Sequence, residues 1–280
     1  MLCLMRTALN WGFVLRGSAG AMAALVLLAG GGALWVGQAF LPVPYAPPPP
    51  PPTILAPRGE LPPNATGLQL WVRRQGEAER LAGSAFLLAL PDGLVVGVTA
   101  AHNLAWGDVD RILDSMTLRI ANRGEGGAAE DIEGQAGLQV VGLHGAPGRP
   151  RRFGLDLSSD RALLALDGEV AGLFFEPDPR GGAQAGERIL LLSGLDGRGY
   201  EGIVFQSEPH GIWSLMEGTF DPSRMSGSPA VSLHTGKVVG MAVAAGWREG
   251  RLVLGLHPVG ALVEQGISDQ QRLELNPADG

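Results

Sequence analysis

The chain begins with a long apolar stretch. Residues 17–41 contain no charged side chain, and Arg6 and Arg16 precede them without an acidic residue. This run of 25 residues exceeds the ~20 needed to span a bilayer, and a globular core helix is rarely apolar on every face at such length. Because positive flanks stay in the cytoplasm, we expect residues 1–16 to be cytoplasmic and the bulk of the chain to be exported, to the periplasm or the cell exterior.

A cleaved signal peptide is the alternative to a transmembrane signal anchor. The small residues Gly37 and Ala39 flank Gln38, as a signal peptidase requires. The apolar run is nevertheless longer than a signal core of about 7–15 residues. Cys3 precedes the run, so it does not fit a lipoprotein cleavage site. The pattern favours the uncleaved anchor, and hence a single-pass membrane protein.

Residues 42–66 have the composition of a linker. They include six consecutive prolines at 47–52. Proline fixes φ and lacks a backbone donor, so this segment is expected to be an extended polyproline II spacer without a core. A ligand for a proline-recognition domain is the alternative interpretation, and the adjoining membrane segment favours the spacer.

From residue 67 the pattern changes to short apolar or alternating runs, which predict β-strands. The expected strands of the first half are 68–72, 85–90, 94–99, 138–143 and 162–166. Those of the second half are 189–192, 202–206, 212–216, 229–233, 238–244 and 252–256. The connecting segments are expected to be a surface loop at 121–137, a Pro/Gly-rich crossing at 176–184, a short closing helix at 259–264 and a polar tail at 267–280.

Composition agrees with an all-β domain and excludes some functions. The 280 residues include 43 Gly and 21 Pro, which favour many strands and turns over long helices. The formal net charge of −7 provides no basic field for phosphates, so nucleic acid is not an expected partner. Cys3 is the only cysteine, so the globular part has no disulfide and depends on its core for stability.

Three residues stand out as candidates for chemistry. His102 follows the apolar run 94–99, where a side chain can be rigid yet reachable. Asp160 precedes the predicted strand 162–166, and a buried aspartate there needs a partner such as a histidine N–H. Ser226 lies in the turn Ser-Gly-Ser-Pro before a strand, which can expose a nucleophile close to backbone N–H groups. The order His, Asp, Ser is that of chymotrypsin-type enzymes and differs from subtilisins and α/β-hydrolases.

The motifs Thr-Ala-Ala-His, Asp-x-Ala-Leu-Leu and Ser-Gly-Ser-Pro around these residues resemble those of trypsin/chymotrypsin-like serine peptidases. The chain is most similar to the disulfide-free bacterial branch that includes the HtrA and glutamyl-endopeptidase groups, without the PDZ domain of full-length HtrA enzymes. The resemblance covers about 67–266 and implies an all-β, chymotrypsin-like double β-barrel with the site between the barrels. It implies serine endopeptidase activity on protein or peptide substrates, without a cofactor.

The resemblance also implies the roles of the site residues. His102, Asp160 and Ser226 would form the catalytic triad, and the backbone N–H groups of Arg224 and Ser226 would form the oxyanion hole. No His-Glu-x-x-His motif or Cys/His pair is present, so no metal site is expected.

Two positions depart from the pattern of the family. Arg224 replaces a glycine, which predicts backbone strain of about 1–3 kcal/mol and an imperfect or conditional oxyanion hole. Arg161 replaces an apolar residue after the acid and is expected to face outward. The alternative function is therefore a catalytically weakened binding or scaffold protein on the same fold.

Overall fold

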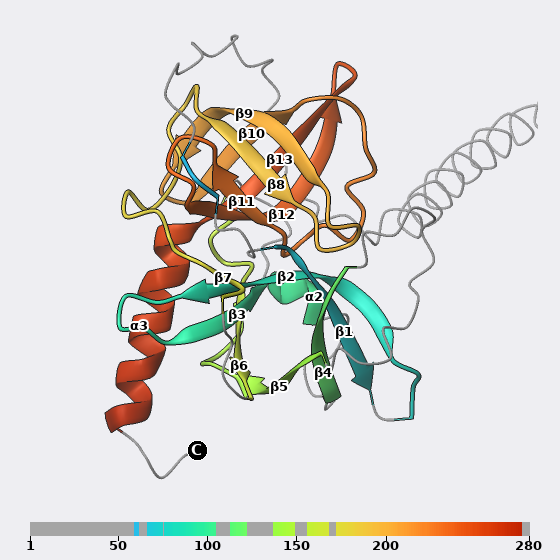
Figure 1. Ribbon diagram of the computed structural model, residues 1–280, viewed down its shortest axis with the longest axis vertical. Coiled ribbons are helices and arrows are strands. Elements are labelled where there is room, and N and C mark those ends of the chain that lie inside the picture. Colours follow the sequence, from blue (N-terminus) through green and yellow to red (C-terminus); the bar gives the residue numbers. More distant parts are fainter. Residues whose placement is uncertain are drawn as a thin grey trace, which may run out of the picture. The chain divides into compact units, whose positions relative to one another are not determined.

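Two groups of antiparallel strands, each closed on itself, make up the fold (Figure 1). The computed structural model describes residues 59–61, 66–74, 76–104, 113–121, 137–148, 156–167 and 172–275, without the side chains of 113–114 and 269–275. All of these residues belong to the compact unit 40–280.

The first barrel contains six strands in the order β1-β4-β5-β6-β3-β2, and the pairing of β1 with β2 closes it. Its strands are β1 (Leu68–Arg74), β2 (Arg80–Ala89), β3 (Val95–Thr99), β4 (Leu113–Ile120), β5 (Leu138–Leu143) and β6 (Ala162–Leu166). The two-residue strand β7 (Phe174–Phe175) adds parallel to β2. The Phe86 and Phe175 rings meet edge to face there, with 6.1 Å between their centroids.

The second barrel is closed in the order β10-β13-β12-β11-β8-β9. Its strands are β8 (Arg188–Leu192), β9 (Gly199–Glu208), β10 (Gly211–Met216), β11 (Pro229–Ser232), β12 (Val238–Arg248) and β13 (Arg251–Pro258). β10 is buried along its whole length, so its apolar run shows no alternation. Each barrel encloses its own apolar core, around Leu70 and Leu118 in the first and around Leu191 and Ile212 in the second. The predicted all-β double barrel is confirmed.

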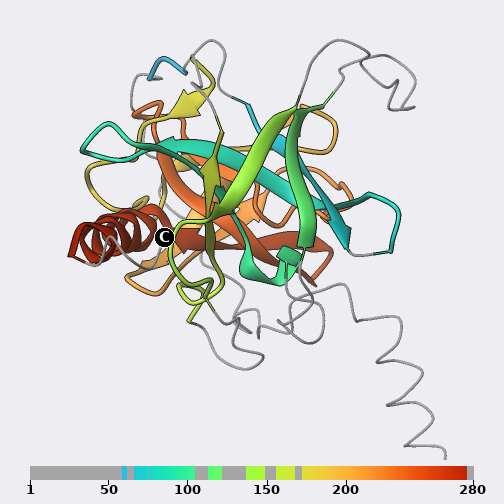
Figure 2. The ribbon, with the colours of Figure 1, turned by 90° about the horizontal axis from the view of Figure 1, so that it is seen from below.

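Two helices complete the described fold. The four-residue helix α2 (Ala101–Leu104) follows β3, and α3 (Val259–Leu275) follows β13. Figures 1 and 2 show α3 along one side of the barrels. It begins at the second barrel and reaches the first, where the His144 ring hydrogen-bonds to the Gly266 carbonyl at 3.3 Å.

The strand pattern missed some elements and shortened others. β4 was not predicted, although Met116 and Leu118 alternate in its sequence and are buried. The helix predicted at 259–264 continues to Leu275, through part of the expected polar tail. Within the predicted linker, Gly59 donates its N–H to the Leu233 carbonyl at 2.9 Å, so this part of it is bound to the second barrel.

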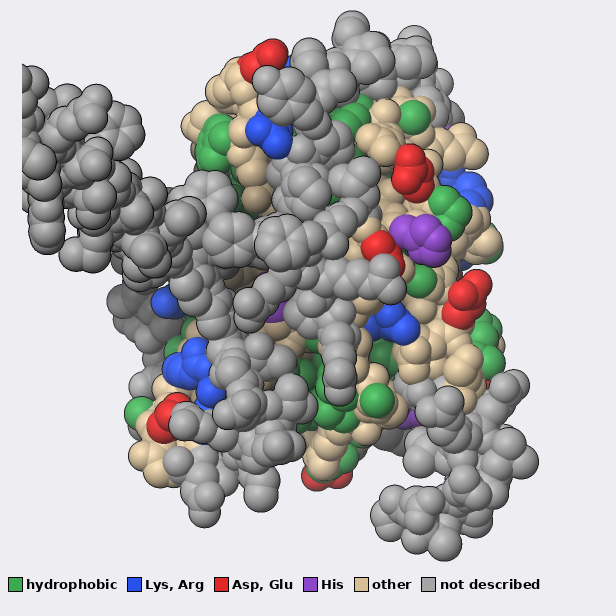
Figure 3. All heavy atoms as spheres, turned by 180° about the vertical axis from the view of Figure 1, so that it is seen from behind, with side chains coloured by type: hydrophobic (Ala, Val, Ile, Leu, Met, Phe, Trp, Pro, Cys, Tyr) green, Lys and Arg blue, Asp and Glu red, His purple; other side chains and the backbone are tan. Residues whose placement is uncertain are grey.

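Some predicted features lie outside the described residues. These are the apolar segment 17–41, residues 42–58 and 62–65 of the linker, and 122–136 of the surface loop. Within the described ranges, no helix is both long and apolar enough to cross a membrane. On the described part of the face in Figure 3, acidic and basic side chains are interspersed.

The crossing between the barrels contains a buried ion cluster. Arg180 donates to Asp178 Oδ2 at 2.6 Å and to Glu187 Oε1 at 2.9 Å. Both carboxylates are almost fully buried. Burial alone would raise the pKa of each carboxyl, but hydrogen bonds from Arg180 and from neighbouring N–H and hydroxyl donors outweigh it, so both pKa values lie below their ordinary range. The same interactions raise the pKa of Arg180 above its ordinary value.

We expect Arg180→Met to lower the free energy of unfolding at pH 7 by about 3–5 kcal/mol, because two buried carboxylates lose their cation. Their depressed folded-state pKa values give stability that is present above about pH 4 and lost on further acidification. The difference between wild type and variant should therefore shrink as pH falls below about 4. Urea unfolding of both proteins across pH measures it.

Arg180→Lys is the matched control, since it keeps the charge and loses only the planar fork of donors. It should cost less than the methionine variant at pH 7. Equal losses for both variants, with no dependence on pH, would contradict the role of the charge.

Candidate active site

The pairing of β3 with β6 brings the histidine and the aspartate together. In this antiparallel pair Thr99 faces Ala162, so the end of β3 lies beside the start of β6. His102 is on α2, immediately after β3, and Asp160 is in the loop that enters β6. The two residues, 58 positions apart in sequence, therefore meet at one rim of the first barrel.

Two hydrogen bonds connect His102 to Asp160. The imidazole Nδ1 lies 2.6 Å from Asp160 Oδ2, and the backbone N–H of His102 donates to Oδ1 at 3.0 Å. Asp160 is 2% exposed, whereas the His102 side chain is 17% exposed. A buried carboxylate at Nδ1 fixes the tautomer with the proton on Nδ1 and leaves Nε2 as the acceptor. The imidazole is thus held as a reachable base.

Ser226 comes from the second barrel, in the turn that leads into β11. Its carbonyl oxygen accepts hydrogen bonds from the Ser84 N–H at 3.0 Å and from Asn103 Nδ2 at 2.7 Å. Asn103 is the residue after His102, so the serine peptide is attached to the same helix as the imidazole. No direct hydrogen bond joins the Ser226 hydroxyl to the His102 ring in the described structure. In ligand-free enzymes such bonds are often long and tighten when substrate binds.

The surroundings of the turn distinguish its two serines. Ser226 is partly exposed, while Ser228 is fully buried and its hydroxyl accepts from the Gly194 N–H at 3.5 Å. Gly227, between them, has φ 95°, and a Cβ there would lie 1.8 Å from the Ser84 carbonyl oxygen. Only glycine fits this approach of the two barrels. Ser226 is therefore the serine available for chemistry.

Arg224 occupies the position where the resemblance leads us to expect glycine. Its φ is 65°, in the left-handed region that strains a side chain with a Cβ. The buried Ser84 hydroxyl donates to the Arg224 carbonyl at 3.1 Å and holds the peptide in this conformation. Among the described residues, neither the Arg224 N–H nor the Ser226 N–H donates to a backbone carbonyl. Both expected oxyanion donors are thus without a backbone partner there.

A buried polar network behind the turn was not singled out from the sequence. Thr99 Oγ1 donates to the Ser84 carbonyl at 2.7 Å, and Asn103 Nδ2 lies 3.0 Å from Thr99 Oγ1. The available signal was the presence of Ser84 and Thr99 inside otherwise apolar strands, since buried hydroxyls need partners. These residues connect the first barrel to the Ser226 turn.

Arg161, which was expected to face outward, is partly buried and is not part of the first barrel's apolar core. Its guanidinium donates to the Ser158 carbonyl and, at 2.7 Å, to Gln265 Oε1 of α3. No cluster of metal-ligating side chains occurs in the part of the chain that the structure describes.

The sequence matches no protein-family model and no curated protein. Among solved structures it is similar to "HtrA-type protease AlgW with decapeptide", at 14% sequence identity and a TM-score of 0.48. The match covers 74% of this chain and 65% of the other, so this chain spans slightly less than two thirds of that protein's length. The topology of the two barrels defines the class of the fold as a trypsin-like double β-barrel.

The strain at Arg224 predicts an unusual order of stability between two variants. We expect Arg224→Gly to be more stable than Arg224→Ala by about 1 kcal/mol, because alanine keeps the steric cost of a positive φ and glycine does not. Thermal or urea unfolding of the two variants measures the difference.

The control is the same pair of substitutions at Arg198. This residue is exposed and its φ is not positive. Alanine should equal or exceed glycine in stability there. An alanine variant at position 224 as stable as the glycine variant would show that the left-handed conformation is not maintained in solution.

Proposed function

We propose that this protein is a serine endopeptidase in which His102, Asp160 and Ser226 form the catalytic triad. The observation that carries the proposal is that hydrogen bonds join His102 to Asp160 and join the Ser226 turn to the helix of His102. His102 and Asp160 share two hydrogen bonds, and the Ser226 carbonyl is bound by the neighbouring residue Asn103. A nucleophile, a base and a group that orients the base define acyl transfer.

Each residue has a definite role in the proposed reaction. Ser226 Oγ attacks the scissile carbonyl carbon while His102 Nε2 accepts the hydroxyl proton. The tetrahedral intermediate then expels the amine, which takes that proton from the imidazolium. Water repeats the sequence on the acyl-enzyme, releasing the acid and restoring the serine. Asp160 keeps the imidazole in its tautomer and stabilises the positive charge.

The developing oxyanion would be bound by the backbone N–H groups of Arg224 and Ser226. Loss of one such donor costs roughly 10²–10³ in rate. The Ser84 hydroxyl supports this arrangement, because its bond to the Arg224 carbonyl opposes relaxation of the strained residue. A non-glycine residue can thus serve at this position at some cost in stability.

A polypeptide is the substrate that fits the adjoining strand. The pairing of β12 with β11 ends at Met241. Beyond Ala242, β12 pairs only with β13 in the described structure. Ala242 accepts from the Gly227 N–H and donates to the Ser228 carbonyl, the two residues that directly follow Ser226. The free edge of β12 therefore starts beside Ser226, and an extended peptide could add to it as a further strand.

Labelling with a fluorophosphonate probe tests the nucleophile on the full chain. We expect Ser226→Ala to abolish labelling and to lower peptide turnover by about 10⁶-fold, the loss typical of a nucleophile knockout. Mass spectrometry of the labelled wild type should place the adduct on Ser226.

Ser228→Ala is the control two residues away, because this hydroxyl is fully buried and accepts from the Gly194 N–H. It should keep labelling. An adduct on Ser228 would show that Ser226 is not the nucleophile. A folded wild type that neither labels nor hydrolyses any peptide would reject the peptidase in favour of a binding or scaffold protein.

We further propose that residues 17–41 anchor the protein in a membrane, with the barrels on the exported side. The support is the uncharged run of 25 residues after Arg6 and Arg16, which is long enough to span a bilayer. The proline-rich segment would then act as the spacer.

The full chain is expected to remain with membranes after carbonate washing, and added protease should reach the barrels only from the exported side. Replacing Leu27 and Leu28 by arginine is expected to release it, since charges near the centre of the span oppose insertion. A mature N-terminus near Phe40 would instead identify a cleaved signal peptide.

A further inference from the structure

The loop that carries Asp160 is bound to both barrels, and several of its contacts come from the second. This acid loop, residues 156–161, enters the first barrel through β6. Leu157 donates its N–H to the His210 carbonyl at 2.7 Å, in the turn between β9 and β10. The fully buried Leu157 side chain lies close to Gly255 and Trp213, also of the second barrel.

His257 of β13 supplies the central contact to the acid loop. It is fully buried, and its Nε2 lies 2.8 Å from the Ser158 carbonyl oxygen, two residues before Asp160. The other ring nitrogen, Nδ1, lies 2.9 Å from the Pro258 carbonyl oxygen. Both ring nitrogens thus face acceptors.

A neutral imidazole can satisfy only one of these acceptors. Burial, together with the positive charge of Arg161, lowers the pKa of His257 to about 4, although the two carbonyls and Asp160 favour the charged form. At pH 7 the ring is therefore neutral and has a single N–H. The tautomer with the proton on Nε2 donates to Ser158, whereas the other would turn a lone pair toward that carbonyl.

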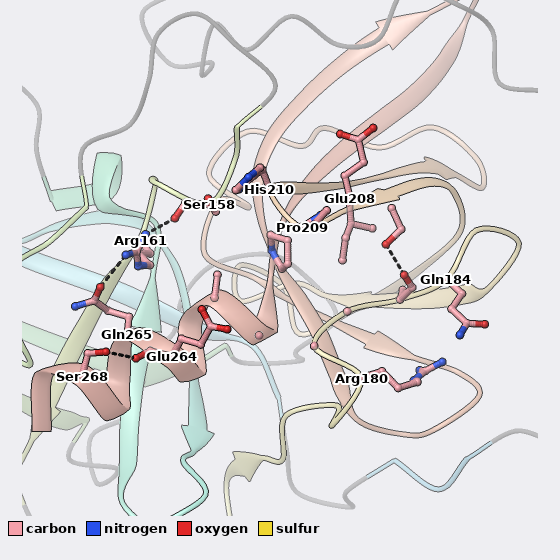
Figure 4. A pocket seen from close by; sticks show the side chains of 18 residues that line it. Ser158, Arg161, Arg180, Gln184, Glu208, Pro209, His210, Glu264, Gln265 and Ser268 are labelled. Carbon is pink, nitrogen blue, oxygen red and sulfur yellow. Dashed lines mark hydrogen bonds between the residues drawn. The ribbon is translucent and has the colours of Figure 1, made fainter. Parts of the chain in front are cut away.

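Arg161 is the second donor to the same carbonyl. Its guanidinium bonds to the Ser158 oxygen and to Gln265 of α3, as Figure 4 shows. Both Ser158 and Arg161 line a cavity of about 750 Å³ between the acid loop, α3 and the β9–β10 turn.

We propose that His257 carries its proton on Nε2 and is a positioning residue which, together with Arg161, holds the Ser158 carbonyl and thereby aligns Asp160 with His102. The role as part of catalysis rests on the proposed peptidase function. The effect on the Asp160–His102 hydrogen bond is independent of that function, because this bond is a property of the folded chain.

The test compares His257→Leu, which removes the donor at similar volume, with His257→Gln, which keeps an N–H donor. Each is made in a Ser226→Ala chain, where hydrolysis cannot interfere. The readout is the low-field proton resonance of His102 Nδ1–H, a signature of a short hydrogen bond to a carboxylate. The resonance is assigned to His102 by its disappearance when His102→Gln is introduced into the same chain.

We expect the resonance to be lost or shifted upfield in His257→Leu and retained in His257→Gln. His144→Leu is the matched control, since it also removes a buried imidazole but one that bonds to Gly266 instead of the acid loop. It should retain the resonance. In chains with Ser226 intact, His257→Leu should lose about 10²-fold in kcat/KM with KM unchanged, the cost of a small misplacement of a catalytic group.

A retained resonance in folded His257→Leu, or equal loss in the glutamine variant, would overturn the proposal. If His257→Leu does not fold, Arg161→Met removes the other donor to Ser158, and an unchanged resonance there would overturn it instead. Absence of hydrolysis in the wild type would reject the peptidase function while leaving the resonance test valid.

Discussion

The carbonyl oxygen of Ser226 is the point at which the two barrels are joined around the site. It accepts from the Ser84 N–H and from Asn103 Nδ2, both of the first barrel. The close approach that these bonds require leaves no room for a Cβ at Gly227. Because the Ser226 turn and the His102 helix come from different barrels, this contact sets the distance between them.

The two barrels support each other's part of the site. The first barrel holds the Ser226 turn through Ser84, Thr99 and Asn103. The second barrel holds the acid loop through the His210 carbonyl, His257 and the buried side chain of Leu157. The donor and acceptor groups in both sets lie mainly in the interior, where an unmade hydrogen bond is costly, so the arrangement resists displacement. Neither barrel by itself would define the positions of all three residues.

Strain and support coincide at Arg224. A positive φ costs energy in any residue with a Cβ, and such strain persists only where surrounding contacts enforce it. Here the Ser84 hydroxyl donates to the Arg224 carbonyl, and the Ser84 N–H donates to the Ser226 carbonyl two residues later. The position shows how a residue that is unfavourable locally can be retained by contacts from the other barrel.

The sequence by itself determined the fold class and the candidate residues, because both depend on local pattern. Short apolar runs predicted most strands of both barrels, and the order of His102, Asp160 and Ser226 indicated the site. Local pattern failed where contacts distant in sequence decide the outcome. Arg161 is bound to Gln265 of α3, 104 residues away, and β4 is defined by pairing with β1 and β5 across long segments. Only the tertiary structure could identify Ser84, Asn103 and His257, since their polar groups gain a role through partners from the other barrel.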